Sequence, residues 1–222
     1  MTAPRVEAFG DSGVLVTLGD RIELAASARA AALAEAIAAA TAGKPGWGRP
    51  INAYASVLIS IDPLEPGVEA ALDVVRTVVA TASGSASAAG GQRPVLELPT
   101  RYGGPDGPDL ETVAELHGLR PADVIELHAG MLYTVHFLGF APGFAYLGEL
   151  PSEIATPRLA TPRTHVPAGS VAIADRQTAV YPFASPGGWR LLGRTTVDLW
   201  DVTADPPARL RARDRVRFVP IR

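Results

Sequence analysis

Arginines placed near prolines are the residues of this sequence best suited to chemistry. The triplet Thr-Pro-Arg occurs at 156–158 and again at 161–163, and a third arginine, Arg194, follows a glycine. Because proline fixes φ, the guanidinium groups of Arg158 and Arg163 leave the backbone in a limited set of directions. A guanidinium binds a carboxylate or phosphate through two parallel hydrogen bonds. The pattern favours a small-anion site or a partner-facing surface, and surface salt bridges are the plainer alternative.

Histidines and single carboxylates give no second catalytic pattern. We expect no metal site, because no two histidines have the spacing His-x-x-x-His or His-Glu-x-x-His. The four histidines are His117, His128, His136 and His165. In a strand predicted at 132–140, His136 is expected to be half-buried and structural, with a loop-facing catalytic role as the alternative. Asp11 and Asp175 lie in predicted turns, where aspartate is common.

Serine, lysine and cysteine chemistry are not indicated either. Ser170 lies in Ala-Gly-Ser-Val, which is not the Gly-x-Ser-x-Gly turn of a serine hydrolase. The only lysine, Lys44, stands between turn residues, and the sequence has no Gly-x-x-x-x-Gly-Lys-Ser/Thr loop for nucleotide phosphates. Without cysteine the chain has no disulfide, no thiolate nucleophile and no sulfur-ligated metal.

The charge of the chain is unevenly distributed. The whole chain carries a formal charge of −3, whereas residues 158–222 hold eleven arginines and five aspartates and so carry +6. This basic end suits an anionic ligand or an acidic partner. Its arginines are scattered among apolar residues, so nucleic-acid binding is not expected. No apolar run could span a membrane and no signal peptide is visible, which favours the cytoplasm.

The first half predicts an α+β domain at 1–82. A strand, a Gly-Asp-Ser-Gly turn and a second strand are expected over 6–18, and apolar spacing predicts helices at 22–40 and 68–80. One strand is expected between these helices, at 51–61. The order predicts a small sheet with helices packed on one face.

A small-residue stretch, predicted as a flexible linker at 83–93, separates this domain from a second one at 94–222. Strands are expected at 94–99, 132–140, 171–174 and 215–221. Two short helices are expected at 110–117 and 121–128, the first capped by Asp109 and the second opened by Pro121. Many short strands with Gly and Pro turns predict a β-barrel.

Ordered motifs in the second domain resemble the family of the B-type subunit of 5-oxoprolinase. These motifs are LGFAPGFAYL at 138–147, ATPR at 160–163, VPAGSV at 166–171, QT at 177–178, YP at 181–182, SPGGW at 185–189 and GRT at 193–195. The segments at 9–13, 54–56 and 62–63 resemble the amino-terminal part of the family more loosely. The same family includes the Kip-type inhibitor of a sporulation histidine kinase, and was formerly called allophanate hydrolase subunit 1. It is also similar to part of the carboxyltransferase region, of subdomain C and D type, in urea carboxylase.

The resemblance implies an amino-terminal α+β domain joined to a cyclophilin-like β-barrel. It implies a C-type sister subunit, with which this chain would activate the lactam of 5-oxo-L-proline, and an A-type subunit that would hydrolyse it to L-glutamate. ATP would be the co-substrate of this heteromeric complex, with Mg²⁺, although no motif of this chain binds it. The substrate would be a small anion, which agrees with the basic carboxy-terminal end.

The resemblance also implies site residues. Polar contacts are expected from Arg163, Ser170, Gln177 and Arg194. Contacts that bind the substrate or shape its loops are expected from Phe140, Pro142, Gly143, Tyr146, Pro167, Gly169, Tyr181, Ser185, Pro186, Gly187, Gly188, Trp189 and Thr195. The segment at 174–181 lacks a glycine that the family usually has, which puts a close backbone approach to a ligand in doubt there.

Two other functions compete with the enzymatic one. A Kip-type inhibitor would dock its barrel on a sensor histidine kinase, and family membership alone motivates this hypothesis. A free-standing prolyl isomerase is suggested by the barrel, but the catalytic arginine and aromatic pattern of cyclophilins is not recognisable. A neighbouring gene for the C-type sister would favour the enzyme over the kinase inhibitor.

Overall fold

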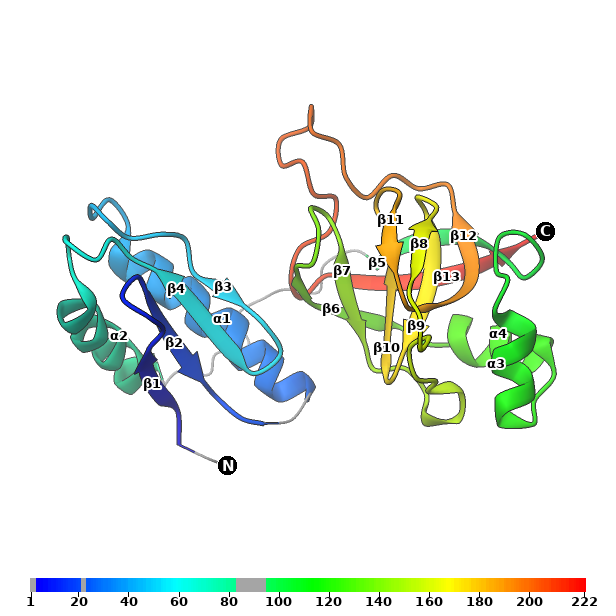
Figure 1. Cartoon of the computed structure of the whole chain (residues 1–222), viewed down its shortest axis with the longest axis horizontal. Helices are drawn as coiled ribbons and strands as arrows, with labels where there is room; N and C mark the ends of the chain where they lie inside the picture. Colours follow the sequence, from blue (N-terminus) through cyan, green and yellow to red (C-terminus); the bar gives the residue numbers. More distant parts are fainter. Residues whose placement is uncertain (1–2, 21–22, 83–94) are drawn as a thin grey trace. The chain divides into compact units, whose positions relative to one another are not determined.

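The computed structural model of the chain describes residues 3–20, 23–82 and 95–222 (Figure 1). The chain divides into two compact units, Met1–Gly91 and Gln92–Arg222, each with its own hydrophobic core. The linker predicted at 83–93 lies outside the described residues, so it stays a prediction.

The first unit is a four-stranded antiparallel sheet with two helices. Its strands have the order β1-β2-β4-β3, and the helices contact each other and the sheet. In chain order the elements are β1 (Arg5–Ala8), β2 (Gly13–Thr17), α1 (Leu24–Thr41), β3 (Ile51–Asn52), β4 (Ser56–Ser60) and α2 (Val68–Ala82).

Alternating burial explains why these strands face their helices. Val14 and Val16 of β2 are fully buried, as are Val57 and Ile59 of β4, so every second side chain enters the core. Helix α2 buries Ala71, Leu72 and Val75 at helical spacing.

The single strand predicted at 51–61 is wrong, because two strands occupy that stretch. The backbone N–H of Ala53 donates a hydrogen bond of 2.8 Å to the carbonyl of Ser56, which closes a turn. Strand β3 therefore folds back on β4, with Ile51 opposite Leu58. The apolar alternation continues through the turn, so the sequence pattern hides it.

The second unit contains a closed seven-stranded barrel with the strand order β10-β7-β6-β13-β5-β12-β9. Its strands are β5 (Val95–Tyr102), β6 (Tyr133–Leu138), β7 (Ala145–Gly148), β9 (Ser170–Ala174), β10 (Gln177–Val180), β12 (Arg190–Thr195) and β13 (Arg215–Ile221). A two-stranded sheet accompanies the barrel, formed by β8 (Arg163–Val166) and β11 (Ser185–Gly187). The remaining elements are α3 (Leu110–His117), α4 (Pro121–Ala129) and the 3₁₀ turn η1 (Ser152–Ile154).

The barrel is closed by its last strand. Strand β13, drawn red in Figure 1, pairs parallel with β5 from Arg215 opposite Val95 to Ile221 opposite Arg101. On its other side it pairs antiparallel with β6. The predicted combination of mixed helices and strands with a β-barrel is thus confirmed. No helix in the described ranges is long and apolar enough to cross a membrane.

A buried histidine links α4 to three barrel strands. The hydroxyl of Thr178 donates to the carbonyl of Ala172 at 3.0 Å, so its oxygen accepts the Nε2–H of His128 at 2.9 Å. The Nδ1 atom of His128 is then unprotonated and accepts the hydroxyl of Tyr102 at 2.7 Å. Burial lowers the pKa of His128 from 6.5 to about 3, so the ring is neutral.

The other histidine of interest, His136, is buried more deeply than expected. The residue is 2% exposed, and it lies where the pairing of β6 with β7 shifts register between Val135 and Phe137. A Cβ added at Gly148 would lie 2.2 Å from its Nε2 atom. The predicted structural role fits this position, but half-burial is wrong.

Candidate functional site

Arg163 is held by a carboxylate from a distant part of the chain. Its Nη2 atom lies 2.7 Å from Oδ1 of Asp109, and its Nη1 donates at 3.5 Å to the carbonyl of Trp189. The other carboxylate oxygen of Asp109 accepts the backbone N–H of Leu191 at 2.7 Å. Only 9% of the Asp109 side chain and 29% of the Arg163 side chain are exposed.

The expected helix cap at Asp109 is wrong. Asp109 precedes α3 but makes no side-chain capping hydrogen bond, because both its oxygens are used by Arg163 and Leu191. Aspartate often caps helices, but Asp109 instead connects the start of α3 to β8 through Arg163 and to β12 through Leu191. This carboxylate is the main site residue that sequence reasoning missed.

Arg194 is positioned by the turn that precedes β9. Its Nε atom donates a hydrogen bond of 2.8 Å to the carbonyl of Ala168. The next residue of the turn, Gly169, has φ of +79°, and a Cβ there would lie 2.2 Å from the carbonyl oxygen of Thr195. The backbone N–H of Thr195 in turn donates to Gly169 at 2.9 Å. Only glycine fits this close approach, which explains the motifs around Gly169 and Arg194 together.

The two arginines share a small pocket of about 200 Å³, here called the first pocket. It is lined by Pro105, Asp106, Pro108, Arg163, His165, Pro167, Ser170, Leu191 and Arg194. Ser170 is opposite Arg194 in the pairing of β9 with β12. The structure therefore brings together three of the four residues predicted to make polar contacts.

A second pocket of about 390 Å³ adjoins the first, since Asp106 and Arg194 line both. Its lining consists of Arg101, Asp106, Ala168, Gly169, Pro182, Arg194, Thr195, Thr196, Val197 and Asp198. The predicted site residues Gly169 and Thr195 belong to it. His165, Asp106 and Asp198 line the pockets without having been predicted, because no motif marked them.

Gln177, the fourth residue expected to make polar contacts, lies elsewhere. It is 8% exposed in β10, opposite Ala174 of β9, and lines neither pocket. The turn between these strands contains Asp175 with φ of +51°. Its N–H donates to the carbonyl of Thr156 at 2.8 Å, and the carbonyl of Arg176 accepts from Leu150 at 2.9 Å. The backbone of this turn, where the sequence departs from the family pattern, is therefore hydrogen-bonded to Leu150 and Thr156 of the same chain.

The four aromatic residues predicted for the site gather around Phe144 in one cluster beside β8 and β11. Phe144 meets Tyr146, Tyr181 and Trp189 edge to face, with ring centroids 5.1, 5.4 and 5.7 Å apart. Phe140 contacts Phe144 at 5.2 Å and is 65% exposed. Burial raises the pKa of Tyr181, opposed by a hydrogen bond from the Trp189 backbone.

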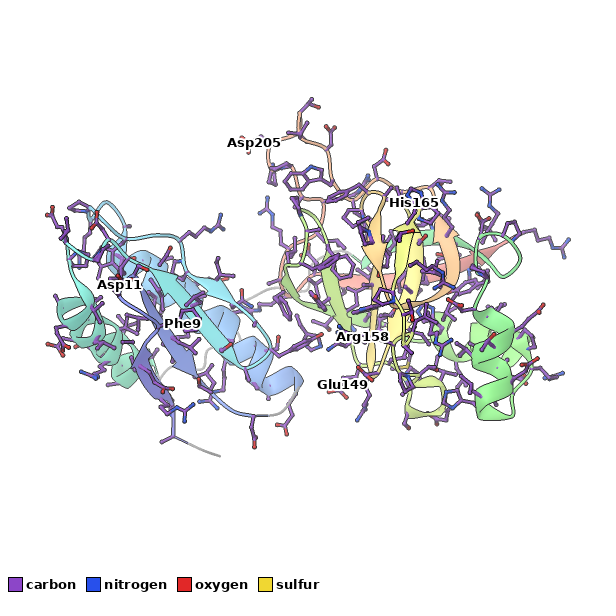
Figure 2. All side chains as sticks on the ribbon, in the orientation of Figure 1. Phe9, Asp11, Glu149, Arg158, His165 and Asp205 are labelled. Atoms are coloured by element: carbon purple, nitrogen blue, oxygen red, sulfur yellow. The ribbon has the colours of Figure 1, made fainter. Side chains whose placement is uncertain are left out.

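A third arginine belongs to this cluster. The guanidinium of Arg158 lies over the ring of Trp189, 5.7 Å from its centroid, where a cation–π attraction operates. In Figure 2, Arg158 and Glu149 are drawn lower in the barrel unit than His165 of the first pocket. The predicted residues thus lie mainly in a polar pocket and an aromatic cluster, which the hydrogen bond from Arg163 to the carbonyl of Trp189 connects.

The remaining predicted residues shape these two regions. A Cβ at Gly143 would lie 2.9 Å from Cβ of Trp200, and one at Gly187 would lie 2.2 Å from the hydroxyl of Tyr181. The others lie in the loop before Phe144, in β11, or directly after it: Pro142, Ser185, Pro186 and Gly188. In the described ranges no group of three His, Cys, Asp or Glu side chains could hold a metal ion.

The sequence profile named "Carboxyltransferase domain, subdomain C and D" matches residues 4–210. The chain belongs to this family. It is 38% identical over 226 residues to the B-type subunit of 5-oxoprolinase from Bacillus subtilis, covering 98% of this chain and 92% of that protein. It is 55% identical over 125 residues to the protein of the same name in Escherichia coli O157:H7, covering 56% of this chain and 57% of that protein.

Two solved structures contain the same fold within longer chains. The crystal structure of TTHA0988 matches 96% of this chain with a TM-score of 0.81 and 37% identity, and this chain spans 40% of its length. The Kluyveromyces lactis urea carboxylase matches 99% of this chain with a TM-score of 0.79 but 20% identity, and this chain spans 22% of its length. The latter likeness concerns the fold alone.

Proposed function

We propose that this chain is the B-type subunit of an ATP-dependent 5-oxoprolinase, which converts 5-oxo-L-proline to L-glutamate. The observation that carries the proposal is the similarity along 98% of the chain to a protein named as that subunit. The arginine-lined first pocket supports it, because the substrate is a small carboxylate and guanidinium groups bind carboxylates well.

In the proposed reaction the complex transfers the γ-phosphoryl group of ATP to the lactam oxygen and releases ADP. The lactam is a poor electrophile, and phosphorylation draws electron density from its carbonyl carbon. Water then adds to that carbon, and breaking the C–N bond opens the ring to γ-glutamyl phosphate. A second water releases phosphate and leaves L-glutamate. This chain would orient the lactam for these steps.

The proposal includes partners. A C-type sister subunit would share the phosphorylation with this chain, and an A-type subunit would carry out the hydrolysis. ATP and its Mg²⁺ would bind in the complex, since this sequence has no phosphate-binding loop and the first pocket has only about 200 Å³. A cyclophilin-like fold of the barrel remains part of the proposal.

Reconstitution tests this function. The chain would be purified with candidate C-type and A-type subunits, and ATP-dependent release of glutamate from 5-oxo-L-proline would be measured with each protein omitted in turn. We expect release only when all three are present. Unchanged release without this chain, or none from a stable complex of the three proteins, would contradict the proposal.

A further inference from the structure

Three arginines line the two adjoining pockets, and two of them are paired with a carboxylate. The Nε atom of Arg101 lies 3.4 Å from Oδ2 of Asp106, and Arg163 is bound to Asp109 at 2.7 Å. Arg194 makes no ion pair with any side chain of ranges 3–20, 23–82 and 95–222. Of the three pocket arginines, Arg194 is therefore the one whose positive charge is left for a ligand.

The guanidinium of Arg194 is also prepared for such a role. Its Nε–H is used by the carbonyl of Ala168, which fixes the plane of the group. Neither terminal nitrogen has a hydrogen-bond partner within the described part of the chain, and the side chain is exposed. A guanidinium group that is already held through its Nε atom loses less conformational entropy when its terminal nitrogens bind an anion. Arg163 differs, because both its terminal nitrogens already have acceptors.

The charges around Arg194 favour the first pocket over the second. The first pocket adds Arg163, His165 and Ser170, and its one lining carboxylate, Asp106, is paired with Arg101. The second pocket adds Arg101, whose charge is already paired with Asp106, and Asp198, which would repel an anion. An anion held by Arg194 is therefore more stable on the side of Ser170.

Size narrows the class of ligand. The first pocket has a volume of about 200 Å³, whereas pockets for drug-sized molecules usually have about 300 to 1,000 Å³. A small carboxylic acid with one ring fits within the first pocket, whereas a nucleotide would have to extend beyond it. Its apolar lining from Pro105, Pro108 and Leu191 suits the methylene groups of such an acid.

We propose that the first pocket binds the carboxylate of a small acid through the terminal nitrogens of Arg194, while the Asp109–Arg163 pair holds the wall of the pocket. The identity of the acid as 5-oxo-L-proline rests on the proposed function. The division of labour between the two arginines does not, because it follows from their hydrogen bonds.

The test compares Arg194→Ala, Arg194→Lys and Arg190→Ala in the complex with its partner subunits. Arg190 is a matched control, since it lies on the same strand and its Nε also donates to a backbone carbonyl, that of Pro157, at 3.3 Å. It lines neither pocket.

Binding is measured calorimetrically for three probes. The first is 5-oxo-L-proline, the second is 2-pyrrolidinone, which is the same lactam without the carboxylate, and the third is inorganic phosphate. The Michaelis constants (KM) for the lactam acid and for ATP are measured beside them.

Loss of the charge-assisted hydrogen bonds between a guanidinium and a carboxylate weakens binding by roughly 10- to 100-fold. We expect Arg194→Ala to raise both the dissociation constant and the KM for the lactam acid by that factor, with the KM for ATP and the binding of 2-pyrrolidinone unchanged. Arg194→Lys should lie between, because it keeps the charge and loses the planar fork. Arg190→Ala should match the wild type.

The possible outcomes separate this inference from the proposed function. If turnover occurs and Arg194→Ala leaves the KM for the lactam acid unchanged, the inference is overturned and the function stands. If only phosphate binding or the KM for ATP changes, the pocket binds phosphoryl groups and the inference is overturned. If no turnover occurs but 5-oxo-L-proline still binds and depends on Arg194, the inference stands and the proposed function fails. If the wild-type complex binds no 5-oxo-L-proline, the proposed function and the inference for this acid are both overturned.

Discussion

Asp109 shows how much of the site depends on one side chain. Its carboxylate is 9% exposed and joins the guanidinium of Arg163 to the backbone of Leu191. A nearly buried carboxylate is stable only when its oxygens have donors, and here each oxygen has one within 2.7 Å. The pair therefore fixes the positions of α3, β8 and β12 around the first pocket.

Replacing this carboxylate by an amide should lower stability. In Asp109→Asn the N–H of Leu191 can keep its acceptor, but Arg163 loses its counter-charge in a largely buried position. We expect a loss of about 1 to 3 kcal/mol in the free energy of unfolding of the barrel unit. Urea denaturation followed by tryptophan fluorescence measures it.

A matched substitution serves as the control. Glu97 and Arg217 form an ion pair at 3.7 Å on β5 and β13, with side chains 60% and 49% exposed. The substitution Glu97→Gln should change stability by less than about 1 kcal/mol, because exposed ion pairs contribute little. If Asp109→Asn and Glu97→Gln lowered the free energy of unfolding equally, the burial of Asp109 would not matter for stability.

At the scale of elements, the buried chain from Tyr102 through His128 to Thr178 ties α4 to the barrel. His128 is neutral in the fold, since burial lowers its pKa from 6.5 to about 3. In the unfolded chain its pKa returns to the ordinary value, so below pH 6.5 the unfolded state binds the extra proton. The contribution of His128 to the free energy of unfolding is therefore fully present above this pH and is lost as the pH decreases towards 3.

The lowered pKa of His128 makes the free energy of unfolding depend measurably on pH. Between pH 7 and pH 5 the contribution of His128 to the free energy of unfolding should fall by about 2 kcal/mol. The variant His128→Gln should lose that part of the pH dependence, whereas His165→Gln, at an exposed position, should retain it. Denaturant titrations at several pH values measure it, and identical slopes for His128→Gln and wild type would refute the assignment.

Local signals explain which elements could be predicted. Helix α3 begins and ends at the predicted residues, because Gly118 in a left-handed conformation stops it, and Pro121 opens the next helix. The role of Asp109 was missed because Arg163 lies 54 residues further along the chain. The resemblance grouped Arg163, Ser170 and Arg194 with Gln177, and only the fold shows that Gln177 lines neither pocket.

At the scale of the whole molecule, the two units have separate cores. One core contains Val16 and Ile59, and the other contains Leu98 and Ile173, with no described residue common to both. Domains with their own cores unfold as separate cooperative units unless a large interface couples them. We therefore expect two transitions in calorimetry.

Core truncations should separate these transitions. Ile59→Ala and Leu98→Ala each remove a fully buried side chain and should each lower the stability of one unit by about 2 to 5 kcal/mol. Each substitution should shift a different transition. Leu64→Ala, at a side chain that is 92% exposed, is the control and should shift neither. A single transition lowered by both core variants would contradict the expectation.

The position of β13 in the barrel has a consequence for synthesis on the ribosome. Strands β5 and β6 leave the exit tunnel early, yet the edges that face each other stay unpaired until Arg215–Ile221 has emerged between them. The elements of the first unit precede them all and can complete their own sheet meanwhile. The nascent barrel therefore exposes two open strand edges for most of its translation, and open edges invite pairing with other chains. Chaperone contact during translation should concentrate on this interval and end when the last strand inserts.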